Sequence, residues 1–303
     1  MARNEGTPVI RASALTKSYG RDRGIESLDF DVEQGEIFGF LGPNGAGKTT
    51  TIRLLLDLIR PTSGIVRLFG VEPRSNPGLR RRIGYLPGDL RLYEHLTGRE
   101  ILQYFAELRG LSSPAAGHAL AERFGLELDR PVKSLSRGNR QKIGIVQAFM
   151  HDPELIILDE PTSGLDPLVQ QTFYALLLEV RSTGRTVFLS SHVLPEVQHV
   201  ADRVALLREG KVLLIETVEA LRSHALTHVE VTLAEVAARD AFAGLEGVQE
   251  VERHNSTILF ALRGEIDPLV KALAAHHVLG IDSHEADLED VFLSLYRQGH
   301  DAP

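Results

Sequence analysis

One glycine-rich segment constrains the fold of this chain more than any other feature: Gly42-Pro43-Asn44-Gly45-Ala46-Gly47-Lys48-Thr49-Thr50. It fits the pattern G-x-x-x-x-G-K-[ST], which forms a phosphate-binding loop when a strand precedes it and a helix follows. The apolar run at residues 37–41 predicts a short buried strand, and the pattern over residues 49–59 predicts an amphipathic helix. A chance glycine turn is the alternative, and this flanking context argues against it.

The composition of this loop is suited to holding phosphate. Glycines allow backbone N–H groups to turn inward around an anion, and a helix N-terminus adds partial positive charge. Lys48 is expected to reach the β and γ phosphates of a nucleotide, and the Thr49 hydroxyl is a candidate ligand of Mg²⁺. The candidate nucleotide-binding residues in this loop are Gly42, Asn44, Gly45, Ala46, Gly47, Lys48, Thr49 and Thr50.

Further strand and helix patterns alternate along the first 225 residues. Apolar runs at residues 155–158 and 187–189 predict buried strands, and amphipathic patterns at residues 98–108, 139–150 and 168–181 predict helices. This alternation is typical of an α/β domain with a mainly parallel sheet. Ligands of such domains bind at the carboxyl ends of the strands.

Two carboxylates, Asp159 and Glu160, follow the strand predicted at residues 155–158. Asp159 is expected to hold Mg²⁺, usually through water, and Glu160 is a candidate general base that polarises an attacking water. The alternative is an acidic pair that only solvates a strand end. Its position after the phosphate loop favours the functional interpretation.

An ordered set of motifs resembles the ATP-binding subunits of ABC transporters. The set covers residues 9 to about 222 and consists of Tyr19, the phosphate loop, Leu135-Ser136-Arg137-Gly138-Asn139, Leu158-Asp159-Glu160-Pro161-Thr162, Ser163-Gly164-Leu165-Asp166 and His192. The resemblance implies ATP and Mg²⁺ as cofactors. It also implies an ABC-type P-loop ATPase fold with a parallel core, an antiparallel β subdomain and a helical subdomain at about residues 89–150.

The resemblance also assigns roles to residues outside the loop. Tyr19 would stack on adenine, although a tyrosine packed on its own strand is the alternative. Glu160 would be the general base, and His192 would contact the γ-phosphate and orient the water, which makes Lys48, Glu160 and His192 the expected catalytic residues. Asp166 would lie in a loop that crosses between two subunits.

The segment around Ser136 and Gly138 resembles the signature that caps the γ-phosphate bound by the opposite subunit of a head-to-tail dimer. One chain would then be unable to complete a site, so we expect a second ATPase subunit, most simply in a homodimer. The common signature has glycine where this chain has Arg137. Two interpretations of Arg137 stay open: contact with a phosphate from the partner subunit, or pairing with a nearby carboxylate.

Gly88 is a second departure, because many relatives have a glutamine there that touches Mg²⁺ and the attacking water. Our hypothesis is that Asp89 or a water replaces that glutamine, or that turnover is slow. The following stretch, with Leu92, Tyr93 and Leu96, would in the family receive a short helix of a membrane subunit, or would pack internally.

The acidity of the chain is concentrated at its end. The net charge is −8, and residues 226–303 have 5 basic and 14 acidic side chains, which leaves the first 225 residues near neutral. We therefore expect an ATPase domain at residues 7–223 and an acidic accessory domain at 224–303. Its predicted order is strand 229–233, helix 234–245, strand 248–253, strand 257–262, helix 266–276 and strand 278–283, the pattern of a small α+β ferredoxin-like domain.

A terminal helix from Leu288 carries Leu-Glu-Asp-Val-Phe, which resembles the C-terminus of bacterial export-type ABC ATPases for drugs, antibiotics or lipids. The chain has no apolar run long enough to span a membrane, so export requires a separate transmembrane permease and places the chain at the cytoplasmic face of the membrane. The alternative is a soluble ABC-type ATPase switch not coupled to transport. The absence of cysteine excludes thiolate chemistry, and the net acidity argues against a nucleic-acid partner.

Overall fold

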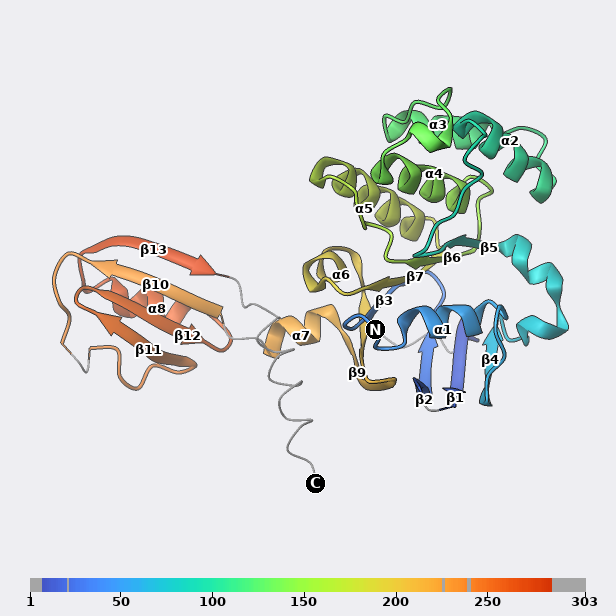
Figure 1. The fold of residues 1–303 in the computed structure, drawn as a ribbon. Helices are drawn as coiled ribbons and strands as arrows, with labels where there is room; N and C mark the ends of the chain where they lie inside the picture. The colour runs from blue at the N-terminus through green and yellow to red at the C-terminus, as the bar shows by residue number, and fades with distance from the viewer. Residues whose placement is uncertain (1–6, 21, 225–226, 239–240, 285–303) are drawn as a thin grey trace. The chain divides into compact units, whose positions relative to one another are not determined.

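The computed structural model describes residues 7–20, 22–224, 227–238 and 241–284. Contacts between residues divide the chain into two compact units, Met1–Glu216 and Thr217–Pro303. Figure 1 shows the elements of both units along the chain. The phosphate loop and all the motifs quoted above for the ATPase resemblance belong to the first unit.

A six-stranded sheet forms the centre of the first unit, in the order β5-β6-β7-β3-β8-β9. Neighbouring strands from β5 to β8 run parallel, as the sequence predicts. The carboxyl ends of β3 and β6 therefore meet at one edge, where the phosphate loop and the two carboxylates follow. The strands of this sheet are β3 (Ile37–Leu41), β5 (Ile83–Leu86), β6 (Leu155–Asp159), β7 (Thr186–Ser191), β8 (Arg203–Arg208) and β9 (Lys211–Thr217).

Both faces of this sheet are buried, because successive side chains of a strand point to opposite faces. In β6, Leu155 and Ile157 join the cluster on one side, whereas Ile156 and Leu158 join the cluster on the other. The first cluster includes residues of α1 (Lys48–Leu55), and the second includes residues of α5 (Pro167–Ser182). This double burial explains why these strands are continuous apolar runs.

A three-stranded antiparallel sheet, β2-β1-β4, packs on the α1 side of the core. Its strands are β1 (Ile10–Tyr19), β2 (Asp22–Val32) and β4 (Ser63–Leu68). Phe30 of β2 lies between the layers, with its ring centroid 5.4 Å from that of Phe40 and 6.1 Å from that of Phe188. The expected antiparallel β subdomain is confirmed.

The helical part of the first unit contains α2 (Gly98–Arg109), α3 (Ala115–Arg123) and α4 (Arg137–Phe149), drawn together in green in Figure 1. Helix α2 begins with a capping box, in which Thr97 and Glu100 satisfy each other's backbone N–H groups, and ends at Gly110 with φ +72°. The remaining helical elements of this unit are η1 (Pro73–Ser75), η2 (Pro77–Arg82), η3 (Val132–Ser134) and α6 (Leu194–Val200).

The second unit contains a four-stranded antiparallel sheet in the order β11-β12-β10-β13. In chain order this is fourth-first-third-second read from β13, which is the strand arrangement of a split βαβ domain. Val231, Phe260 and Leu269 lie in its buried core. The elements are α7 (Val218–His224), β10 (Thr227–Leu233), β11 (Val248–His254), β12 (Thr257–Leu262), α8 (Asp267–Leu273) and β13 (Val278–His284).

The helix predicted over residues 234–245 is wrong for the described residues, which form bends and turns. Arg253 gives the physical reason, because its Nη1 donates hydrogen bonds to the carbonyls of Ala237, at 2.8 Å, and Ala238, at 3.2 Å. A helix would use those carbonyls internally. Gly244, with φ +78°, further disfavours helix there. The helix predicted from Leu288 lies outside the described residues.

In the described part of the chain, none of the helices is long and apolar enough to cross a bilayer.

Candidate active site

The phosphate loop joins β3 to α1 in a conformation that needs glycine. Gly45 and Gly47 have φ values of +82° and +108°, where a side chain is strained. At Gly47 a Cβ atom would also come within 2.5 Å of the Ile25 side chain, and at Gly42 within 2.6 Å of the Leu207 carbonyl. Close packing therefore leaves room only for glycine at Gly42 and Gly47. Helix α1 begins directly after the loop, and its first turn contains no acidic side chain.

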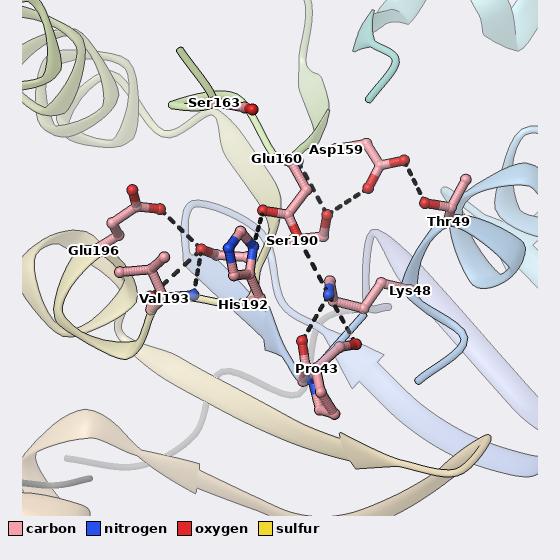
Figure 2. Close-up of polar contacts among 12 residues, drawn as sticks. Pro43, Lys48, Thr49, Asp159, Glu160, Ser163, Ser190, His192, Val193 and Glu196 are labelled. Atoms are coloured by element: carbon pink, nitrogen blue, oxygen red, sulfur yellow. Dashed lines mark hydrogen bonds and ion pairs between the residues drawn. The ribbon is translucent and has the colours of Figure 1, made fainter. Parts of the chain in front are cut away.

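Lys48 is buried inside this loop and is fully engaged. Its Nζ donates hydrogen bonds to the carbonyls of Gly42, at 2.6 Å, and Pro43, at 3.2 Å. The same nitrogen lies 3.1 Å from Oε1 of Glu160 as an ion pair, without the alignment of a hydrogen bond. Figure 2 shows the ammonium group between the loop and the acidic strand end. The structure thus brings together two of the three expected catalytic residues.

Asp159 is completely buried at the end of β6, and both of its oxygens accept hydrogen bonds from hydroxyl groups. Thr49 Oγ1 donates to Oδ2 at 2.8 Å, and Ser190 Oγ donates to Oδ1 at 2.6 Å. The two residues expected to hold Mg²⁺, Thr49 and Asp159, are therefore in direct contact although 110 residues separate them. Ser190 holds the Asp159 carboxylate from its other side (Figure 2).

The pKa of Tyr85 is affected by the negative charge at the end of β6. Burial, and after it the charge of Asp159, raises the pKa of the Tyr85 hydroxyl to about 12. A carboxylate at this depth is normally paired with a cation or saturated with hydrogen bonds. Asp159 accepts from two hydroxyl groups and forms no ion pair with a described residue, so a divalent cation would complete its charge balance.

Glu160 follows Asp159 in a left-handed backbone conformation, with φ +50°. Such a conformation is costly for a residue with a side chain and is held by its surroundings. Its N–H donates to the carbonyl and the hydroxyl of Ser190, each at 3.2 Å. Gln141 of α4 donates to the next carbonyl, that of Pro161, at 2.9 Å. These contacts hold the Glu160 backbone, from which the carboxylate reaches Lys48 of the phosphate loop.

His192 follows β7 and completes the cluster. Its Nδ1 lies 2.7 Å from Oε2 of Glu160, and 47% of its side chain is exposed. The backbone at its position is anchored by Ser191, whose hydroxyl accepts from the N–H of Val193 at 3.0 Å and donates to Glu196 at 2.8 Å. One carboxylate, that of Glu160, is thus shared between Lys48 on one oxygen and His192 on the other (Figure 2).

The remaining expected site residues lie outside this cluster. Ser136 is the N-cap of α4 and accepts from the N–H of Asn139 at 3.2 Å, and Asp166 is the N-cap of α5 and accepts from the N–H of Val169 at 3.0 Å. Tyr19 ends β1 with 44% of its surface exposed, and Nζ of Lys17 lies 5.2 Å from its ring centroid. These positions leave Ser136, Asp166 and Tyr19 available at the surface of the unit.

Two departures from the common motifs have clear structural settings. Among the described residues Arg137 forms no ion pair with a carboxylate: its Nη2 donates to the hydroxyl of Ser163 at 2.7 Å, and contact with a phosphate from the partner subunit stays a prediction. At Gly88 a Cβ atom would lie 3.1 Å from Oδ2 of Asp159, so the backbone there lies against the candidate metal ligand. The Asp89 carboxylate instead pairs with Arg91 at 2.9 Å on the surface.

Sequence reasoning assigned no role to three residues that shape the site: Ser190, Gln141 and Ser163, the last of which begins one of the quoted motifs. The signal for Ser190 was present, because two serines end an otherwise apolar strand directly before His192. Hydroxyl groups at the buried end of a strand need partners, and the neighbouring strand end offers carboxylates. Gln141 lies in α4 and Ser163 in the loop after Glu160, and each contacts the other segment. The spacing of these residues in the sequence does not predict those contacts.

Comparisons with known proteins agree with this geometry. The ABC transporter family profile matches residues 25–163. The bacitracin transport ATP-binding protein BcrA of Bacillus licheniformis is 36% identical, over 96% of this chain and 98% of that protein. The Nod factor export ATP-binding protein I of Cupriavidus metallidurans is 32% identical, over 95% and 97%. A solved ATP binding subunit of an ABC transporter is 32% identical with a TM-score of 0.65, over 71% of this chain and 92% of that one.

Proposed function

This chain belongs to the family of ABC transporter ATP-binding proteins and is an ATP hydrolase, and we propose that it powers export of a substrate through a separate transmembrane permease. The ATP-hydrolysing part of this function rests on the single carboxylate of Glu160, which lies between the phosphate-loop lysine and His192. An ammonium, a carboxylate and an imidazole converge where the loop would hold the terminal phosphates of ATP. Hydrolysis of ATP to ADP and phosphate in P-loop ATPases uses a lysine on the β and γ phosphates and a further residue that orients or activates the attacking water.

Each residue of the cluster has a distinct role in the proposed reaction. Lys48 moves its ammonium from Glu160 to the β and γ phosphates, where charge develops in the transition state. Glu160 is then free to accept a proton from the attacking water. His192 remains hydrogen-bonded to Glu160, which keeps the carboxylate oriented, and it contacts the γ-phosphate. Tyr19 supports the adenine ring by stacking.

Thr49 and Asp159 fit Mg²⁺ by the chemistry of their donors. A hydroxyl and a carboxylate are hard oxygen ligands, and Mg²⁺ typically binds one or two carboxylates together with substrate phosphates. The direct Thr49–Asp159 contact of 2.8 Å places both donors at one point. When bound there, Mg²⁺ would supply positive charge to the phosphate oxygens.

A second copy of the chain would complete the site. Ser136 and Gly138 lie at the N-terminus of α4, where hydrogen-bond donors of the first helical turn favour an anion. Within its own described chain, neither residue forms a hydrogen bond or ion pair with Lys48, Glu160 or His192. Since one chain has every residue of the cluster, we infer a homodimer in which each signature segment closes on the nucleotide of the partner.

The names of the relatives favour a transporter subunit over a switch that is not coupled to transport. BcrA is named for bacitracin transport and the Nod factor protein for export, and both align over nearly the whole chain. An export subunit would work at the cytoplasmic face of the membrane, bound to its permease. The identity of the exported substrate would be determined by that permease.

An exposed aromatic surface offers a place for the permease. Tyr93 and Tyr104 are 52% and 41% exposed, with ring centroids 5.7 Å apart, and Leu108 of α2 is 67% exposed. Leu92 and Leu96 pack against the core instead, so of the three residues considered in the sequence only Tyr93 is available. Aromatic residues in an exposed apolar patch are typical of protein interfaces.

The test is co-purification from membranes of the host. An affinity-tagged full-length chain should retain a highly apolar, multi-span protein in detergent, and that complex should hydrolyse ATP faster than the chain alone. The variant Tyr93→Glu/Tyr104→Glu should lose the partner and keep its own turnover, whereas the surface variant Tyr93→Phe should keep both. A chain that never retains a membrane protein would contradict the export proposal.

A further inference from the structure

The first turn of α4 is joined to the loop after Glu160 by contacts that the proposed catalytic roles do not use. Arg137 Nη2 donates to Ser163 Oγ at 2.7 Å. The stem of the Arg137 side chain lies along Gly164, because a Cβ atom built on that glycine would be 3.3 Å from both Cγ and Cδ of Arg137. The arginine is therefore held at its head by a hydroxyl and along its stem by a neighbouring backbone.

Two further contacts fix the same pair of segments. A Cβ atom on Gly138 would come within 2.7 Å of the Gly164 carbonyl, so only glycine allows α4 to approach this loop so closely. Gln141, one turn further along α4 and buried, donates its Nε2 to the carbonyl of Pro161 at 2.9 Å. The loop of residues 160–166 thus lies on the first two turns of α4.

This loop begins at Glu160 and holds the backbone from which the Glu160 carboxylate projects. The N–H of Ser163 donates to the Glu160 carbonyl at 3.2 Å, and the N–H of Leu165 donates to Thr162 at 3.0 Å, so the loop is a compact turn. Glu160 begins the turn in its left-handed conformation, with φ +50°. A displacement of Ser163 would therefore be transmitted to Glu160 through a single hydrogen-bonded turn.

We propose that Arg137 is a positioning residue that, through Ser163, sets the orientation of Glu160. The inference rests on the proposed function, because it links two sites of the dimer. Ser136 precedes Arg137 and would touch the nucleotide of the partner subunit, while Glu160 acts on the nucleotide of its own chain. Closure of α4 on one ATP is thereby coupled to the alignment of the general base for the other.

The competing role for Arg137 is direct binding of the partner's phosphate by its charge. The two roles differ in their dependence on Ser163, because a phosphate contact needs only the arginine. A double-mutant cycle between residues 137 and 163 separates them. The exposed position of Arg137 makes the effect of losing one hydrogen bond modest, and we expect a change in rate of about three- to tenfold.

The experiment measures kcat, KM and nucleotide affinity for four full-length proteins: wild type, Arg137→Ala, Ser163→Ala and the double variant. Each single variant should lower kcat about three- to tenfold while KM changes less than about twofold, and the double variant should be no slower than the slower single variant. Ser163→Thr retains a hydroxyl and should restore kcat. A role in stability alone would lower the melting temperature without this division between kcat and KM.

Several results would overturn the inference. Wild-type kcat in Ser163→Ala would show that Arg137 does not act through that hydroxyl, and this variant removes a single oxygen and so decides the question even if Arg137→Ala folds poorly. Fully additive losses would show independent roles, including direct phosphate binding. If wild-type protein turns over ATP while these results fail, only the inference is wrong. If the wild-type protein has no turnover, the proposed function is wrong as well.

Discussion

The side-chain nitrogen of Lys48 lies 3.1 Å from Oε1 of Glu160, so the residue that should bind phosphate and the residue that should activate water neutralise each other. Lys48 is 6% exposed and Glu160 20% exposed, which places the pair away from most of the solvent. A partly buried pair of this kind stabilises both charges only while it is intact. Binding of ATP must break the pair, because the phosphates and Glu160 compete for one ammonium group.

Replacing Lys48 should therefore abolish tight nucleotide binding. In Lys48→Ala the loss of a charge-assisted contact with the phosphates should weaken ATP affinity by about ten- to a hundredfold. Fluorescent nucleotide titration of the full-length protein measures this. Lys271→Ala removes a lysine that is ion-paired on the surface of the second unit and should bind ATP as the wild type does. Equal affinities in Lys48→Ala and wild type would contradict the assignment of the loop.

Asp159→Asn should destabilise the first unit and remove the dependence of ATP turnover on Mg²⁺. Both Asp159 oxygens accept hydroxyl hydrogen bonds, and an amide NH₂ group in place of one oxygen would face a donor. The expected loss is about 1–3 kcal/mol of unfolding free energy, measured by denaturant titration. Asp152→Asn changes an aspartate that is 83% exposed and should leave stability nearly unchanged.

Gly88 lies against Asp159, so substitutions at Gly88 should change the rate of ATP turnover and its dependence on Mg²⁺. Gly88→Ala places a Cβ atom 3.1 Å from Oδ2 of Asp159, so we expect slower turnover. Gly88→Gln adds the same Cβ together with an amide that reaches the metal region, and it should turn over faster than Gly88→Ala and respond differently to Mg²⁺. Identical rates and Mg²⁺ titrations for Gly88→Gln and wild type would show that glycine causes no functional deficit there.

His151 should make the first unit less stable in mild acid. Burial, and after it the nearby Arg109 charge, lowers the pKa of His151 to about 4. Because the unfolded chain has the higher pKa, it binds the proton more readily, so stability is fully present above about pH 6.5 and falls as the pH decreases toward 4. Between pH 7 and pH 5 the proton uptake of His151 should lower the free energy of unfolding by about 2 kcal/mol.

The variant that tests this effect is His151→Gln, which cannot titrate. Denaturant titrations at pH 7 and pH 5 should show a smaller loss of stability in the variant than in the wild type. His254→Gln, at an exposed position in the second unit, provides the matched control and should retain the wild-type pH dependence. A variant as sensitive to acid as the wild type would contradict the role of His151.

Local sequence patterns predicted the parts of the fold that depend on local causes. Alternation of apolar runs and glycine loops predicted the parallel core, because buried parallel strands have to be apolar throughout. The assignment of Thr49 and Asp159 to one Mg²⁺ site rested in part on the rule that ligands bind at the carboxyl ends of parallel strands, and the two residues are in contact. Both expectations rest on backbone geometry that any sequence of this pattern would adopt.

Long-range side-chain contacts explain what the sequence did not predict. Residues 234–245 contain good helix-forming residues, yet Arg253 of β11 takes up the carbonyls that a helix would use. The charge of Arg137 predicts pairing with a carboxylate or with a phosphate of the partner subunit, whereas within its own chain the side chain donates to the hydroxyl of Ser163. In both cases an arginine donates to an uncharged oxygen, and the spacing of the residues in the sequence does not predict that contact.

The release of phosphate by Glu160→Gln tests the proposed chemistry most directly. Glutamine retains the shape of the side chain but cannot accept the proton, and it frees Lys48 from its ion-pair partner. The variant should therefore bind ATP at least as tightly as the wild type and, with saturating ATP and Mg²⁺, release phosphate at least about a hundredfold more slowly. Glu179→Gln, which alters a surface ion pair with Arg123, should turn over normally. Phosphate release by Glu160→Gln at the wild-type rate would contradict the role of Glu160 as the general base.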